Sequence, residues 1–380
     1  MIKYCPKNWV HYNIMKTKSL PIIFLLFLAL SFVSWVIPGI RKDALGKSDY
    51  YIYISLNKEK KIVVFKLDPI KQDLTLIDEQ NLEGEPGSLC IDASYKKLYV
   101  ALRDLKSVGS LRIDKNSGRL IHLKDTPVAD NPVYISTDKK GKYLFFTSYS
   151  GNKIAVYHLE RDGVNKDPVQ VMDAHINPHM IKTDNSGRYV FVPNKGGDIV
   201  QQFIFQNNGS LKPNYPEGVW VKRNSGPRHL TFHSSRDIMY VVNEISCTVV
   251  AFHFDRKNGT LKVPFQEITT KPADFNSYNT CADIHITPDG KFLYASNRGH
   301  NSLAGFSVDA KTGELSPIGW FPTEKEPREF EIDPSGRFLI AAGESSGKIA
   351  LYRIHSDGSL YLLKTYEVGQ WPVWVLAVML

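Results

Sequence analysis

Seven polar side chains stand at matching places of a repeated pattern, each just after a proline or at the end of an apolar run. Arginine guanidinium groups bind a carboxylate or a phosphate through paired hydrogen bonds, and a histidine or glutamate beside them can activate water. The pattern therefore predicts an anion site that contains a base. We expect the catalytic side chains to be His179, Arg228 and Glu244, and the substrate-binding side chains to be His229, Asn243, Arg298 and Arg328.

Other reactive arrangements are weak in this sequence. The serines show no G-x-S-x-G elbow. The spacing of His175 and His179 suits a metal ion only on a helix, which Pro178 would break. We therefore expect no metal and no cofactor. The four cysteines show neither a zinc spacing nor a disulfide framework and are interpreted as small apolar residues of strands: Cys5, Cys90, Cys247 and Cys281.

A repeat must bring these distant side chains together. Short apolar runs recur at intervals of 46 to 54 residues, and each is followed by a turn and a second apolar run. Four short strands in a unit of this length are typical of a β-propeller blade. The seven runs end at Leu56, Leu102, Ser148, Asn194, Asn243, Asn297 and Gly343.

Prolines mark a second strand of each unit, which we expect to be the innermost strand that lines the channel. The last of these strands begins at Pro372 and has no strands after it, whereas the first run, at 51–56, has no proline-led strand before it. The two should complete one blade and close the ring. We predict an all-β, seven-bladed propeller over residues 50–380. The marks are Pro86, Pro132, Pro178, Pro227, Pro327 and Pro372, with Cys281 in the remaining unit.

The first 49 residues differ from the rest. Seven basic and two acidic residues give them a charge of +5, while the remainder has 40 basic and 37 acidic residues, which gives no support to nucleic-acid binding. We divide them into a basic segment (1–19), an uncharged apolar segment (20–37) and a linker (38–49). The apolar segment is long enough for a membrane-spanning helix and also fits a signal peptide. We expect a propeller that is anchored or exported outside the cytoplasm, with a cytoplasmic location if the segment is not used.

Several motifs resemble the 6-phosphogluconolactonase family of seven-bladed propellers, also related to fungal carboxymuconate cyclases, over about residues 51–378. This resemblance implies hydrolysis of a sugar δ-lactone in the pentose phosphate pathway without a cofactor. It also implies a pocket that includes the five residues already selected from the repeat, His179, Arg228, Glu244, Arg298 and Arg328. The motifs are Ser225–His233, Val242–Glu244, Ala282–Gly290, Pro322–Glu324, Pro327–Arg328, Leu339–Gly343 and Val368–Gln370.

A mechanism follows as a hypothesis. Water attacks the lactone carbonyl with His179 or Glu244 as general base, and Arg228 stabilises the oxyanion. Two alternatives remain open: a lactonase or cycloisomerase acting on another carboxylated lactone, and a propeller that binds without catalysis. The expected partner is a small sugar lactone, with the membrane contacted only through the N-terminal segment, and we expect a monomer.

Overall fold

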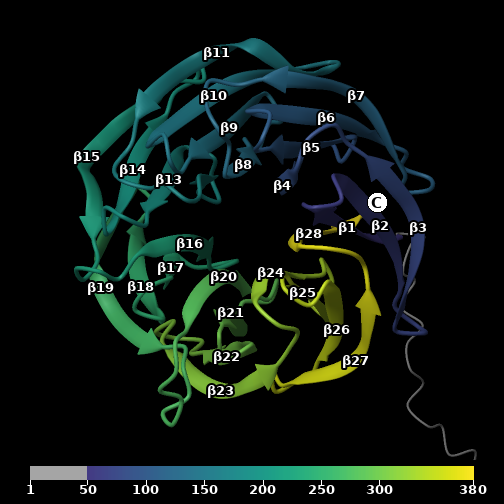
Figure 1. Ribbon diagram of the computed structural model, residues 1–380. Helices are drawn as coiled ribbons and strands as arrows, with labels where there is room; N and C mark the ends of the chain where they lie inside the picture. Colours follow the sequence, from purple (N-terminus) through teal and green to yellow (C-terminus); the bar gives the residue numbers. More distant parts are fainter. Residues whose placement is uncertain (1–48) are drawn as a thin grey trace, which may run out of the picture. The chain divides into compact units, whose positions relative to one another are not determined.

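The computed structural model describes residues 49–380, which form strands and turns only. Seven antiparallel sheets of four strands stand around a central channel, with one strand of each sheet innermost (Figure 1). The predicted all-β, seven-bladed propeller is therefore confirmed. From the channel outward, four sheets are β28 (Pro372–Met379), β1 (Tyr50–Leu56), β2 (Lys61–Asp68), β3 (Asp73–Asn81); β4 (Pro86–Ile91), β5 (Lys97–Leu102), β6 (Ser107–Ile113), β7 (Leu120–Pro127); β8 (Tyr134–Thr137), β9 (Tyr143–Ser148), β10 (Lys153–Glu160), β11 (Gly163–Asp173); and β12 (Lys182–Thr183), β13 (Tyr189–Asn194), β14 (Ile199–Phe205), β15 (Leu211–Trp220). The other three are β16 (Pro227–Phe232), β17 (Ile238–Asn243), β18 (Thr248–Asp255), β19 (Thr260–Thr269); β20 (Thr280–Ile286), β21 (Phe292–Arg298), β22 (Ser302–Val308), β23 (Leu315–Pro322); and β24 (Pro327–Ile332), β25 (Phe338–Gly343), β26 (Lys348–Ile354), β27 (Leu360–Glu367).

The polar turn after an innermost strand is built around an aspartate side chain. In the third blade, Asp138 Oδ1 accepts the N–H groups of Lys142 (2.6 Å) and Tyr143 (2.7 Å). A short carboxylate that satisfies backbone donors explains why aspartate stands here. Asp184 and Asp333 make the same contacts in their own blades. These turns return the chain from the channel to the second strand at a fixed register.

Neighbouring blades are held together by apolar side chains and by tyrosine hydroxyls. The side chains of the second and third strands alternate between the two faces of each sheet and are buried against the next blade. Tyr240 and Tyr294 lie fully buried in second strands, and their hydroxyls donate across the interface to the carbonyls of Gly313 and Gly358, both at 2.7 Å. Each bond satisfies a polar tip that burial would otherwise leave unpaired.

The ring closes through strands from opposite ends of the propeller sequence. β28 pairs antiparallel with β1 from Tyr50↔Met379 to Leu56↔Pro372. The pair extends by two backbone hydrogen bonds between Asp49 and Leu380, of 3.2 and 3.0 Å. The predicted shared blade is confirmed, and the two strands cover each other's open edge.

Two innermost strands have an irregularity near their beginning. In β16 the pairing to β17 jumps between Pro227 and His229, and in β24 the pairing to β25 jumps between Pro327 and Glu329. Such a bulge rotates the strand, so that two consecutive residues face the channel rather than opposite sides of the sheet. The prediction that the proline-led strands line the channel is confirmed (Figure 1).

The N-terminal predictions concern residues outside the described range. The basic segment (1–19), the apolar helix at 20–37 and nearly all of the linker at 38–49 fall there, since the description begins at Asp49. Within residues 49–380, the structure has no helix with the length and apolarity needed to cross a membrane.

Candidate functional site

Two rings of side chains surround one mouth of the channel. The first ring is formed by the residue after each proline position. The second ring is formed by the last residue of the second strand in one blade and by the residue after that strand in the other six. Because the positions are equivalent in all blades, residues far apart in sequence meet here. The first ring is Gly87, Val133, His179, Arg228, Arg328 and Val373, with the buried Ala282 at the equivalent position of the remaining blade, and the second is Asn57, Arg103, Tyr149, Lys195, Glu244, Arg298 and Glu344.

Three adjoining cavities occupy this mouth. Their volumes are about 230, 190 and 370 Å³, and Arg328 lines all of them. The largest opens between the exposed Tyr278 and Trp371 at the rim. Together the cavities form one polar pocket of a size suited to a small, charged ligand.

Glu244 is the centre of the charged cluster. Lys195 Nζ lies 2.6 Å from its Oε1, Arg298 Nη2 lies 3.2 Å from the same oxygen, and Arg228 Nε lies 3.1 Å from Oε2. Although burial raises the pKa of this carboxyl, the charges of Arg228 and Arg298 outweigh it and bring the pKa below the usual value. Glu244 is therefore ionised, and its oxygens hold three cations in place.

Arg228 is a fully buried cation at the base of the pocket. The bulge in β16 turns it toward the mouth, where its Nη1 donates to the carbonyl of Ala282 (2.5 Å) and lies 3.6 Å from Glu329 Oε1. Burial lowers the pKa of its guanidinium to about 10, which still leaves it charged at neutral pH. A buried cation held by Glu244 and a backbone carbonyl is preorganised to stabilise negative charge.

His179 is the buried, uncharged base of the cluster. Its ring stands edge-on to Tyr149 and to His229, with centroids 5.7 and 5.1 Å away. Burial and the charge of Arg228 lower its pKa well below 6.5, so the imidazole is neutral at pH 7. Its Nδ1 is buried without a hydrogen-bond partner among residues 49–380. A neutral imidazole with an unused ring nitrogen can accept a proton.

Arg103 and Arg328 form a second cationic group across the pocket. Both line the same two cavities as His179. Burial, and then the charge of Arg328, lower the pKa of Arg103. Arg328 Nη1 lies 3.6 Å from Glu344 Oε2, and that side chain is 23% exposed. Two like charges that line the same cavities favour a bound anion that neutralises both.

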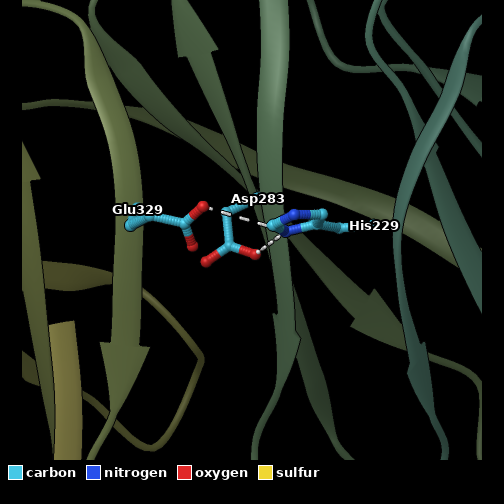
Figure 2. A group of neighbouring side chains, drawn as sticks. All are labelled: His229, Asp283 and Glu329. Atoms are coloured by element: carbon cyan, nitrogen blue, oxygen red, sulfur yellow. Dashed lines mark hydrogen bonds and ion pairs between the residues drawn. The ribbon is translucent and has the colours of Figure 1, made fainter. Parts of the chain in front are cut away.

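Beneath the pocket, His229, Asp283 and Glu329 form a buried group from β16, β20 and β24 (Figure 2). His229 Nδ1 lies 2.8 Å from Asp283 Oδ1 and 4.0 Å from Glu329 Oε1. Burial and the neighbouring Asp283 raise the pKa of Glu329 well above its usual value, whereas burial and Arg228 lower the pKa of His229 to about 3. Ligand atoms of the three lie within 4.8 Å of one another, as a metal site requires, but the charge of Arg228 beside Glu329 opposes a divalent cation.

The structure separates the predicted residues into three groups. His179, Arg228, Glu244, Arg298 and Arg328 meet at the mouth. His229 lies deeper, where it lines a cavity of about 660 Å³ that opens at the opposite end. Asn243 lines none of these cavities: it is fully buried, and its amide donates to Thr248 Oγ1 at 3.0 Å.

Two basic residues of the pocket escaped the sequence analysis. Arg103 follows Leu102 and Lys195 follows Asn194, the same register that had singled out Glu244. Reading the residue after the end of the apolar run in every repeat would have found both. Tyr149 occupies the same position of its repeat and was also missed, and it packs against His179.

Fold and site together define a seven-bladed β-propeller with a cationic pocket, containing a neutral histidine, at one mouth of its channel. The model of the lactonase family described as "Lactonase, 7-bladed beta-propeller" matches residues 44–132 and 124–377. The chain therefore belongs to the seven-bladed β-propeller lactonase family.

Relatives of this chain agree in fold and extent. A 6-phosphogluconolactonase of Serratia proteamaculans is 37% identical over 85% of this chain and 97% of its own, and one of an Enterobacter species is 34% identical over 86% and 98%. The structure of a periplasmic gluconolactonase of Pseudomonas aeruginosa superimposes with a TM-score of 0.79 at 27% identity, covering 87% of this chain and 99% of that one. The whole propeller is thus shared with these proteins.

Proposed function

We propose that this protein hydrolyses the ring ester of a sugar δ-lactone, with 6-phospho-D-glucono-1,5-lactone as the preferred substrate and 6-phosphogluconate as the product. The observation that carries the proposal is the neutral His179 lying in one pocket with the buried cation Arg228. A base and an anion-stabilising group are what ester hydrolysis by water needs. The curated relatives named above support the same reaction. This reaction would place the enzyme in the pentose phosphate pathway.

In the proposed mechanism His179 acts as general base. Its free Nδ1 accepts a proton from water while the water oxygen attacks the lactone carbonyl carbon. The bond between that carbon and the ring oxygen then breaks, and the same proton passes from His179 to the ring oxygen, which leaves as a hydroxyl. Glu244 is less suited to this role because its low pKa and three cationic partners make it a weak base.

Arg228 would stabilise the oxyanion that forms during attack. Its charge is already buried and held by Glu244, so no solvent has to reorganise when negative charge develops on the carbonyl oxygen. Arg298, held by the same carboxylate, would stand beside it and contact the carboxylate product. The two arginines thus favour the charged states of the reaction over the neutral lactone.

Arg103 and Arg328 would bind the phosphate. They are the pair of cations in the pocket that share no carboxylate with the Glu244 cluster, and a phosphate dianion would relieve their repulsion. Arg328→Ala is expected to lower kcat/KM for the 6-phosphate about 10- to 100-fold, the scale of a lost charged hydrogen bond, and to change the value for glucono-1,5-lactone little. Arg353→Ala, which removes an exposed arginine of β26, serves as the matched control.

The deciding experiment compares rates on three lactones: 6-phosphoglucono-1,5-lactone, glucono-1,5-lactone and a muconolactone. Hydrolysis is followed by acid release, and the uncatalysed rate is subtracted. Preference for the phosphorylated sugar lactone, lost in Arg328→Ala, supports the proposal. Preference for the muconolactone would instead indicate a carboxylated lactone as the substrate. No rate above background on any of the three would favour a propeller that binds a ligand without catalysis.

A second candidate, hydrolysis of an unphosphorylated sugar lactone outside the cytoplasm, is favoured by the uncharged apolar segment at 20–37 and the preceding Lys16 and Lys18. A periplasmic gluconolactonase is among the similar structures. We propose that this segment directs export and anchors or releases the propeller. Fractionation of cells that produce the full chain should find it in the membrane or exported fraction, and a variant without residues 1–48 in the cytoplasm. Equal cytoplasmic location of both would refute export.

A further inference from the structure

Two buried thiols face the same small cluster of side chains between neighbouring blades. Cys247 lies in the turn between β17 and β18, and Cys281 near the beginning of β20, with 3% and 0% of their surfaces exposed. Asn279 Nδ2 lies 3.3 Å from Cys247 Sγ and 2.9 Å from Asn297 Oδ1, which in turn lies 3.5 Å from Cys281 Sγ. Thr270 Oγ1 lies 3.0 Å from both Cys281 Sγ and the carbonyl oxygen of Cys247.

Both cysteines depart from the repeat. Cys281 occupies the place where the other six repeats have a proline. Cys247 has a left-handed backbone (φ 53°), which polar turn residues and glycine tolerate best. The other blades keep to such residues at this place: Lys60, Lys106, Asn152, Asp198, Asn301 and Gly347, all with φ between 48 and 70°.

In other blades the side chain at the position of Cys247 reaches the next blade just before its proline. Asn152 Oδ1 accepts the N–H of Asn177 at 2.8 Å, and Asp198 Oδ1 accepts that of Gly226 at 2.9 Å. The repeat geometry therefore aims Cys247 at the beginning of β20. Because Cys281 replaces the proline at that place, the two exceptions to the repeat place the two thiols next to each other.

We propose that Cys247 and Cys281 form a disulfide that joins two blades beside the active site. The oxidant is the disulfide of a thiol–disulfide oxidoreductase or of glutathione. The Cys247 thiolate attacks one sulfur of that disulfide and releases a thiol. Cys281, as it loses its proton, then attacks the Cys247 sulfur of the mixed disulfide and releases the second thiol. Two electrons and two protons pass to the oxidant.

The surroundings make Cys247 the attacking thiol. Hydrogen bonding from the Cys281 thiol, and then the Asn279 amide, lower its pKa to about 6 against the effect of burial, whereas burial raises the pKa of Cys281 well above its usual value. At neutral pH a thiolate thus stands beside a thiol, the arrangement of a reactive dithiol.

The bond would constrain the pocket. The N–H of Cys281 donates to the carbonyl of Glu244 at 3.0 Å, and the carbonyl of Cys281 accepts from Arg298 Nη2 at 3.1 Å. Cys247 is three residues after Glu244 in the same turn. A covalent link therefore ties together the two segments that carry Glu244 and Arg298, and it closes a long loop of the unfolded chain.

The test maps the thiols of the full chain, equilibrated in mixtures of reduced and oxidised glutathione and then alkylated and digested without reduction. We expect a peptide pair joined through Cys247 and Cys281, two hydrogen atoms lighter than the separate peptides. Formation should raise the melting temperature on the order of 5 °C, and the rise should be reversed by dithiothreitol. Cys247→Ser and Cys281→Ser should each abolish both effects, and Cys90→Ser should abolish neither.

The proposal is overturned if Cys247 and Cys281 stay open to alkylation after unfolding at the most oxidising mixture, or if either is found joined to Cys5 or Cys90. The wild-type map alone decides this, so a serine variant that fails to fold does not block the test. The result is independent of the substrate, because no lactone enters the assay.

Discussion

Glu244 touches three cations, so its charge matters for the shape of the pocket as well as its chemistry. Glu244→Gln removes that charge and leaves Arg228 and Arg298 buried against each other. We expect the free energy of unfolding to fall by about 3 kcal/mol, the scale of a broken buried ion pair, and lactone hydrolysis to fall at least about 100-fold because the arginines lose their placement. Chemical denaturation and kcat/KM measure the two effects.

Glu83→Gln is the matched control, since this glutamate is exposed and its side chain forms no ion pair within residues 49–380. It should leave both quantities unchanged. An active, fully stable Glu244→Gln would show that the cluster does not depend on its central carboxylate.

The lowered pKa of His179 predicts the pH dependence. The imidazole can act as a base only when unprotonated, and with its pKa below 6.5 it stays unprotonated as pH falls through that value. The kcat/KM for a lactone should therefore be level through pH 6.5 and decline only at lower pH. His179→Gln should lose about 100-fold or more in rate together with this acid limb. A limb centred at or above pH 6.5 would argue against His179 as the base.

Residue types and their spacing predict much of this site. His179, Arg228 and Arg328 were predicted from a single repeat position, because equivalent places in a ring converge. Asn243 was predicted because it ends an apolar run next to Glu244, but neighbouring residues of a strand point to opposite faces, and its amide donates to Thr248 inside the blade. The ionisation states of Glu244 and His179 depend on distances of a few ångströms, which spacing in a sequence does not contain.

At the scale of the strand, the bulge in β16 decides what the channel contains. It allows Arg228 and His229, adjacent in sequence, both to face inward at different depths. The sequence marked the beginning of this strand by Pro227, and that boundary is confirmed. The extra residue is not marked by any residue type, because a bulge is defined by how two strands pair and not by one strand alone.

Tyrosine hydroxyls connect one blade to the next, and their contribution can be measured. Tyr240→Phe removes the bond to the carbonyl of Gly313 without changing the apolar ring. We expect the free energy of unfolding to fall by about 1 kcal/mol, or somewhat more because the buried carbonyl loses its partner. Thermal or denaturant unfolding reports the change.

Tyr361→Phe controls for the loss of a hydroxyl, because that tyrosine is 60% exposed on an outer strand. Tyr361→Phe should leave the free energy of unfolding unchanged. Equal stability of Tyr240→Phe and the wild type would mean that the hydroxyl bond between blades contributes nothing net.

At the scale of the whole molecule, closure by β28 is the feature most open to test. A chain that lacks residues 372–380 leaves β1 without its inner partner and removes Trp374 from beside His229. We expect it to be aggregated or to melt far below the full chain, by size-exclusion chromatography and circular dichroism. A synthetic peptide of residues 370–380 should restore part of the loss by pairing with β1.

Val375→Ala in the full chain is the comparison, since it costs one buried side chain and keeps the pairing with Ile54. It should melt only slightly earlier than the wild type. A truncated chain that melts like the wild type would show that six blades and three strands are sufficient for a stable propeller.

The sequence predicted this ring because its period is nearly constant and its two incomplete units complement each other. The longest interval, between Asn243 and Asn297, includes the loop that presents Tyr278 at the rim of the pocket. The depth at which each ring of side chains lies, and the division of the channel into a mouth pocket and a second cavity at the other end, cannot be read from the repeat. Both follow from how side chains of seven strands fill a common space.

The pairing of β1 with β28 also orders events during synthesis. During synthesis β1 leaves the ribosome more than three hundred residues before β28. At roughly 5–20 residues per second, the inner edge of β1 therefore stays unpaired for many seconds. During that interval the nascent propeller is an open ring with an unpaired strand edge that can bind other chains. Chaperones that bind nascent chains, or a translocase that requires an unfolded chain, would have to act before β28 pairs with β1.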